Sequence, residues 1–231
     1  MMDLSGFTCD GYERVEHREL KDLHADGLVL RHKKSGARIV LLSNDDPNKV
    51  FAIAFRTTPV NSTGVPHIIE HSVLAGSEKY PVKDPFMEME KGSLKTFINA
   101  FTAADWTMYP CASCNDKDFR NLIDVYMDAV MHPLIYKRKE IFLQEGWRYE
   151  MESPESDLTI NGVVYSEMKG AYSDPERALD FELRKALFPD TTYGVESGGD
   201  PKDIPNLSYE EFLEFHRRRR VVFCSLRSFR T

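Results

Sequence analysis

The stretch GVPHIIEHSVLAG, residues 64–76, decides both the fold and the chemistry expected of this chain. A proline near its start and a glycine at its end delimit a predicted helix from His67 to Ala75. Residues four apart lie on one face of a helix, about 6 Å apart along its axis. The imidazoles of His67 and His71 can therefore reach a single metal ion.

Glu70 lies beside this pair, near the shared face but rotated from it, so it can reach a metal-bound water without being a ligand. Imidazoles hold zinc at about 2.0–2.1 Å, the metal lowers the pKa of its water toward 7, and a carboxylate accepts the proton. The alternative is a helix with two surface histidines and a glutamate that pair locally. The apolar residues around the motif instead favour a buried helix, whose polar residues need partners. These apolar residues are Val65, Ile68, Ile69, Val73 and Leu74.

A catalytic zinc needs a third protein ligand and one position left for water. Glu167 is a candidate because it lies in NGVVYSEMKG, residues 161–170, which predicts a rather apolar helix. The residues alone leave open that Glu167 is an ordinary exposed helical glutamate.

A set of motifs resembles the inverted-motif zinc peptidases of the pitrilysin/insulinase superfamily, and more narrowly its presequence-protease branch. The resemblance covers about residues 20–218 and is specific as a set: GVPHIIEHSVLAGS (64–77), YP (80–81), LKTFINA (94–100), TMYP (107–110), SCNDKDF (113–119) and GVVYSEMKG (162–170).

This resemblance implies one zinc ion per chain, held by His67, His71 and Glu167, with Glu70 as the general base. It also implies substrate contacts on an edge strand, which is predicted to carry three residues: Asn99, Ala100 and Phe101. Members of the superfamily have two homologous halves, and the second supplies an arginine and a tyrosine that stabilise the oxyanion. The implied partners are extended peptide substrates and that C-terminal half.

The edge strand, residues 97–102, has a second rationale. A peptidase with weak side-chain selectivity can hold an extended peptide through main-chain hydrogen bonds, adding it as a strand. The alternative is an ordinary interior strand.

The remaining pattern predicts an α+β fold, an antiparallel-rich sheet covered by helices, as in the N-terminal domain of such peptidases. Turn-formers separate three apolar strands that predict a meander: 27–32, 37–43 and 50–57. A second hairpin joins 97–102 to 106–109. Helices are predicted from Asp84 to Gly92, from Asn115 to Pro133, over 137–145 and 161–172, from a capping box at Ser173 toward Phe188, and from near Ser208.

Composition excludes several classes. With 42% hydrophobic and 29% charged residues among 231, the chain is neither disordered nor a disulfide scaffold. A net charge of -7 argues against a nucleic-acid partner, and no apolar run is long enough for a membrane helix. The first residues lack a secretory signal peptide, so a cytoplasmic location is expected. The Cys111-x-x-Cys114 pair is interpreted as structural packing, since no second pair accompanies it.

One domain is predicted over residues 1–231, with an atypical basic tail at 219–231. Arginines crowd residues 217–230, where the resembling family continues differently. The hypothesis is a frameshift or a break in the gene model near Arg218, against a plain basic surface tail.

The predicted function is a zinc metalloendopeptidase domain that hydrolyses short or unfolded peptides with a metal-activated water and a glutamate base. The first alternative is a truncated, catalytically incomplete fragment that binds zinc and peptide without turnover. The second is a metal hydrolase of another substrate class.

Overall fold

The computed structural model describes residues 3–218 and, for the backbone alone, 222–227. In this part of the chain an eight-stranded sheet has the order β1-β2-β3-β10-β4-β7-β5, and the short β6 also pairs with β7. Of these strand pairs, only β3–β10 is parallel. The strands are β1 (Tyr12–Leu20), β2 (Ala25–His32), β3 (Arg38–Ser43), β4 (Lys49–Arg56), β5 (Lys95–Ile98), β6 (Phe101–Thr102), β7 (Trp106–Ser113) and β10 (Val222–Arg227).

The predicted meander is wrong in one connection. Strands β2, β3 and β4 form where the apolar segments predicted them, but β10 lies between β3 and β4 and pairs with both. Strands adjacent in sequence pair often but not always, and a distant segment can fill the space between them. Strand β1 was not predicted because its side chains are mostly polar and exposed. The rest of the basic tail, 219–221 and 228–231, lies outside the described residues.

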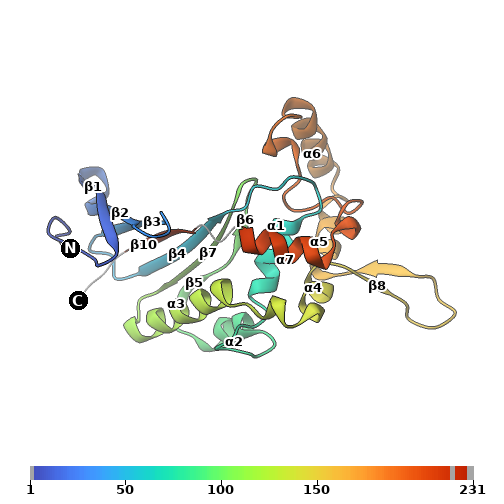
Figure 1. Ribbon diagram of the computed structural model, residues 1–231, viewed down its shortest axis with the longest axis horizontal. Helices are drawn as coiled ribbons and strands as arrows, with labels where there is room; N and C mark the ends of the chain where they lie inside the picture. Colours follow the sequence, from blue (N-terminus) through green and yellow to red (C-terminus); the bar gives the residue numbers. More distant parts are fainter. Residues whose placement is uncertain (1–2, 219–221, 228–231) are drawn as a thin grey trace.

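Helices form where the caps and apolar periodicity predicted them (Figure 1). Asn115 accepts a hydrogen bond from the backbone N–H of Asp118 at the start of α3, and Asp84 caps α2 in the same way. The capping box predicted at Ser173 is wrong by one residue, since Asp174 is the cap. The helices are α1 (Val65–Val73), α2 (Pro85–Gly92), α3 (Asp116–Met131), α4 (Lys139–Glu145), α5 (Val163–Ala171), α6 (Pro175–Leu187) and α7 (Tyr209–Arg218).

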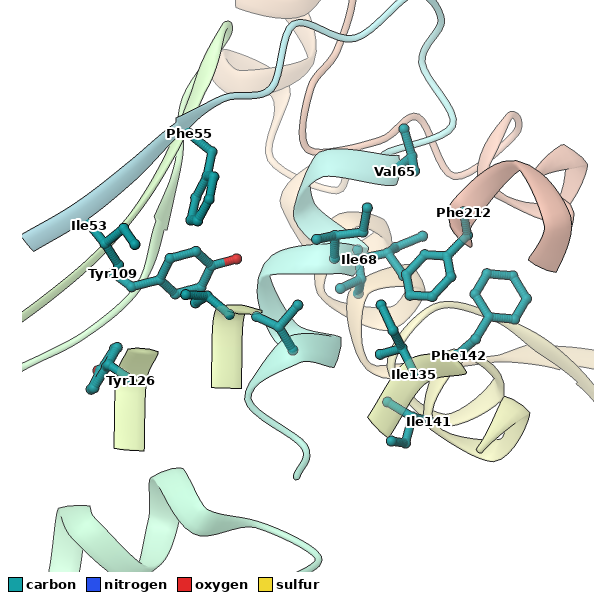
Figure 2. Close-up of a cluster of buried hydrophobic side chains, with 14 of the residues drawn as sticks. Ile53, Phe55, Val65, Ile68, Tyr109, Tyr126, Ile135, Ile141, Phe142 and Phe212 are labelled. Carbon is teal, nitrogen blue, oxygen red and sulfur yellow. The ribbon is translucent and has the colours of Figure 1, made fainter. Parts of the chain in front are cut away.

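The core lies between one face of the sheet and the helices. Along β4 the side chains of Phe51, Ile53 and Phe55 are buried while their neighbours are half-buried, the alternation of a strand covered mainly on one side. Figure 2 shows Ile53, Phe55 and Tyr109 facing the side chains of α1, with Phe142 and Phe212 beyond them. Helix α1 is thus buried between the sheet and helices α4 and α7, which confirms the α+β fold class.

Two smaller features lie at the ends of the molecule. Strands β8 (Arg148–Glu150) and β9 (Thr159–Asn161) form a hairpin that projects beyond α4 (Figure 1). At the other end, Leu4 packs with leucines of β2 and β3 in a separate apolar cluster. None of the described helices combines the length and apolar character that crossing a membrane requires.

Candidate metal centre

The N-terminus of helix α1 is in close backbone contact with a loop that is distant in the sequence. Gly64, its N-cap, has a φ of 70°, the left-handed region that favours glycine. A Cβ at Gly64 would lie 2.8 Å from the carbonyl oxygen of Gly198 and from the Cα of Gly199. This close approach holds the loop of residues 196–200 against the first turn of α1, next to His67.

A second close approach brings α5 to the same place. Gly162, the N-cap of α5, approaches Gly146, the residue after α4, so closely that a Cβ at Gly162 would lie 2.1 Å from its carbonyl oxygen. Gly146 in turn packs against Ile68 of α1. Helix α5 therefore starts beside α1, and Glu167 lies one turn further along it.

Three potential metal ligands meet between these helices. The Nε2 atoms of His67 and His71 each lie 3.7 Å from Oε2 of Glu167, and all three lie within 4.8 Å of one another. Ligands bound at about 2.1 Å to a tetrahedral zinc ion are about 3.4 Å apart, so this set has nearly the required spacing. Two imidazoles and one carboxylate also match the donor chemistry of a catalytic zinc site.

Each imidazole is contacted at its other nitrogen. Nδ1 of His67 lies 3.0 Å from the carbonyl oxygen of Gly198, and Nδ1 of His71 lies 3.5 Å from Oε2 of Glu145. Both contacts direct Nε2 toward Glu167. The rings of His67 and His71 meet edge to face, with their centroids 4.9 Å apart.

The charges around this centre are mostly negative. Burial lowers the pKa of His71, but the hydrogen bond with Glu145 and the charges of Glu70, Glu145 and Glu167 outweigh it, so the pKa is raised above its ordinary value. The pKa of Glu196 is also raised, in this case by burial. The hydrogen bond from the Gly198 N–H and the charge of Arg184 lower it by less. An acidic, partly buried pocket of this kind favours a bound cation.

Glu70 and the predicted edge strand border the same space. A cavity of about 540 Å³ is lined by both histidines, Glu70, Glu167 and all three predicted substrate residues, Asn99, Ala100 and Phe101. A second cavity, of about 280 Å³, lies beside it and shares Glu70, His71, Asn99 and Ala100. Strands β5 and β6 form one edge of the described sheet, because only β7 pairs with them. The prediction of one continuous strand over 97–102 is wrong: Asn99 and Ala100 lie in the break between β5 and β6, and of the three predicted residues only Phe101 lies on a strand. The structure therefore places these residues together, with Glu70 only 8% exposed.

Burial makes Cys111 of the Cys111-x-x-Cys114 pair unsuited to redox chemistry. Cys111 is fully buried, and burial raises the pKa of its thiol to about 12, so the thiolate that redox chemistry requires is not formed. Cys114 is exposed and free. Structural packing is the consistent interpretation.

A second group of potential ligands involves His17, which the sequence left unassigned. His17, Asp3 and Asp26 come together at the far end of the sheet. Nε2 of His17 lies 2.8 Å from Oδ1 of the buried Asp26, whose other oxygen accepts a hydrogen bond from the backbone N–H of Leu4. These contacts attach the N-terminal segment to β1 and β2.

Two contacts of the candidate metal centre do not follow from the sequence. Glu145 was assigned only to a helix, and the loop around Glu196 and Gly198 was not singled out. In a sequence, a glutamate at the end of a predicted helix and two adjacent glycines are weak indications of a functional site. Only the folded chain brings them to the two histidines.

Comparison with known proteins shows which protein family this chain resembles. Residues 55–169 match the family model described as Insulinase (Peptidase family M16). The protein HypA of Clostridium perfringens is 55% identical over 208 residues, which are 90% of this chain and 21% of that protein. Presequence protease 1, chloroplastic/mitochondrial, of Arabidopsis thaliana is 54% identical over 90% of this chain and 19% of its own length.

The fold agrees with these matches. A crystal structure of pitrilysin superposes with a TM-score of 0.69 at 19% identity, covering 96% of this chain and 23% of that one. The superposition shows that the two chains share a fold, and the sequence matches point to a family of peptidases. The chain belongs to the insulinase family, peptidase family M16. It spans about a fifth of the length of the curated relatives it matches.

The predicted cytoplasmic location is wrong. The similar presequence proteases of Arabidopsis thaliana and Mus musculus, the latter 49% identical over 92% of this chain and 20% of that protein, are named chloroplastic/mitochondrial and mitochondrial. The expectation rested on the absence of a secretory signal peptide, and that absence does not exclude an organelle.

The contact at Gly64 gives a first testable prediction. Gly64→Ala should destabilise the fold by about 1–3 kcal/mol more than Gly36→Ala, because overpacking adds to the backbone strain. Gly36 is the matched control: its φ is 74°, but nothing lies within 4 Å of a Cβ there. Urea unfolding of both variants measures the difference. Equal losses of stability would show that the loop moves away at no cost.

Proposed function

We propose that this chain is a single zinc metalloendopeptidase domain, with zinc held by His67, His71 and Glu167. The observation that carries the proposal is the convergence of the two Nε2 atoms on one oxygen of Glu167, at 3.7 Å each. The acidic surroundings and the membership in a peptidase family support it. Extended peptides are the proposed substrates, as the names of the similar presequence proteases suggest.

The chain's own residues have separate tasks in this proposal. Bound zinc would act as a Lewis acid toward a water molecule in the open coordination position and toward the scissile carbonyl. Glu70 accepts the proton of the attacking water on its carboxylate and then passes it to the leaving amine. Its position between two cavities, with little exposure, keeps the carboxylate close to the reacting groups.

The edge strand would hold the substrate. Strands β5 and β6 pair only with β7 in the described sheet, so their outer side is available to an added strand. Asn99, Ala100 and Phe101 border the cavity that contains the histidines. A peptide paired along this edge passes the metal centre in an extended conformation.

The alternative is zinc and peptide binding without turnover. It applies to the chain assayed by itself, because the resemblance implies that a second homologous half supplies groups that stabilise the oxyanion. That half is the proposed partner. In its absence, hydrolysis should fall by about a hundredfold or more.

The decisive test measures zinc content and hydrolysis on one sample of the chain. We expect one zinc ion per chain and hydrolysis of a quenched fluorescent peptide, lost with a chelator and restored by zinc. Zinc binding without hydrolysis would favour the alternative. A chain that binds no zinc would contradict both.

A further inference from the structure

The two imidazoles of the metal centre are supported at Nδ1 by groups outside the helix that carries them. The carbonyl oxygen of Gly198 lies 3.0 Å from Nδ1 of His67, and Oε2 of Glu145 lies 3.5 Å from Nδ1 of His71. A neutral imidazole has one N–H, and the nitrogen that donates it leaves a lone pair on the other for a metal. Acceptors at both Nδ1 atoms therefore select the form in which both Nε2 atoms can bind.

We propose that Glu145 is a positioning residue that holds His71 with its proton on Nδ1, as the Gly198 carbonyl does for His67. The inference rests on the proposed function and extends it beyond the three ligands and Glu70. Glu145 contacts His71 on the side opposite to Nε2. It is therefore neither a metal ligand nor the base.

The placement of Glu145 is costly unless it has such a role. It is the last residue of α4, where the partial negative charge of the helix end disfavours a carboxylate. It is only 9% exposed, and among the described residues the imidazole of His71 is the one basic group within 4 Å of its carboxylate. A buried carboxylate without a cation costs free energy. The Nδ1–H of His71 would supply a hydrogen bond, and a nearby metal ion would supply the compensating charge.

The surroundings of Glu145 hold it in place for His71. The side-chain amide of Gln144 donates to Oε1 at 2.8 Å, which leaves Oε2 for His71. Gly146, the next residue, packs against the side chain of Ile68, one turn from His71 on α1. The end of α4 is thus fixed against the helix that carries both histidines.

Zinc affinity tests the proposal. In competition with a chromophoric chelator, Glu145→Ala should bind zinc about 10- to 100-fold more weakly than the unaltered chain, the usual cost of losing such a partner. Glu145→Gln should recover most of the affinity, because its amide oxygen can accept the same proton. Glu140→Ala is the matched control, since Glu140 is an exposed glutamate of the same helix and should leave the affinity unchanged.

A second readout separates positioning from packing. In the zinc-loaded chain, the Nδ1–H proton of His71 should give a downfield signal in long-range ¹⁵N–¹H correlation spectra. The signal should move upfield or vanish by exchange in Glu145→Ala and shift in Glu145→Gln, while that of His67 stays in place as an internal reference. If the alanine variant does not fold, the near-isosteric glutamine variant carries the test.

The outcomes distinguish the two proposals. If the unaltered chain binds zinc but neither affinity nor the His71 signal changes in the Glu145 variants, the positioning role is overturned and the proposed function stands. If the unaltered chain binds no zinc, the proposed function fails and the positioning role fails with it.

Discussion

Substitution of Glu70 by glutamine is expected to leave one zinc ion per chain but to lower peptide hydrolysis by about 100- to 10,000-fold. Glutamine has nearly the same shape, so the buried helix α1 and its two histidines keep their positions. Its amide cannot accept the proton of the attacking water. The measurements are zinc content of the purified variant and hydrolysis of a quenched fluorescent peptide.

The control for this variant is Glu88→Gln, an exposed glutamate of α2. It should change neither zinc content nor rate. Loss of zinc in Glu70→Gln would mean that Glu70 holds the metal. Unchanged turnover in Glu70→Gln would show that Glu70 is not the general base.

Substitution of Glu167 by alanine is expected to lower zinc affinity strongly, because it removes a metal ligand. Loss of a residue that only supports a ligand, such as Glu145, costs about 10- to 100-fold, and the loss here should be larger. The carboxylate is the one group that both Nε2 atoms approach at 3.7 Å, so no nearby residue on α5 replaces it. Its side chain is 55% exposed, and the fold should therefore keep its stability. Chelator competition and thermal unfolding measure the two quantities.

Glu176→Ala is the matched control, because Glu176 is an exposed glutamate at the start of the next helix, α6. It should leave zinc affinity unchanged. If Glu167→Ala binds zinc as tightly as the unaltered chain, the third ligand is another residue or a water molecule.

Local patterns predicted most of the elements. Caps and apolar periodicity located α2 and α3, because a side chain that bonds to the first turn and a stripe of apolar residues are both read within a few residues. Strand β1 was missed because polar, exposed side chains carry no such pattern. The place of β10 between β3 and β4 was missed because strand order depends on contacts between distant segments.

For the site, residues 64–76 by themselves determined that two imidazoles and one carboxylate share a turn of helix, because helical geometry depends only on spacing. The tertiary structure decided what meets them. Glu167 reaches the histidines through the contact of Gly162 with Gly146, and the loop of Gly198 reaches His67 through Gly64. Glu167 lies 96 positions from His71 (167 minus 71), and Gly198 lies 131 positions from His67. Only close packing of the folded backbone brings residues so far apart together.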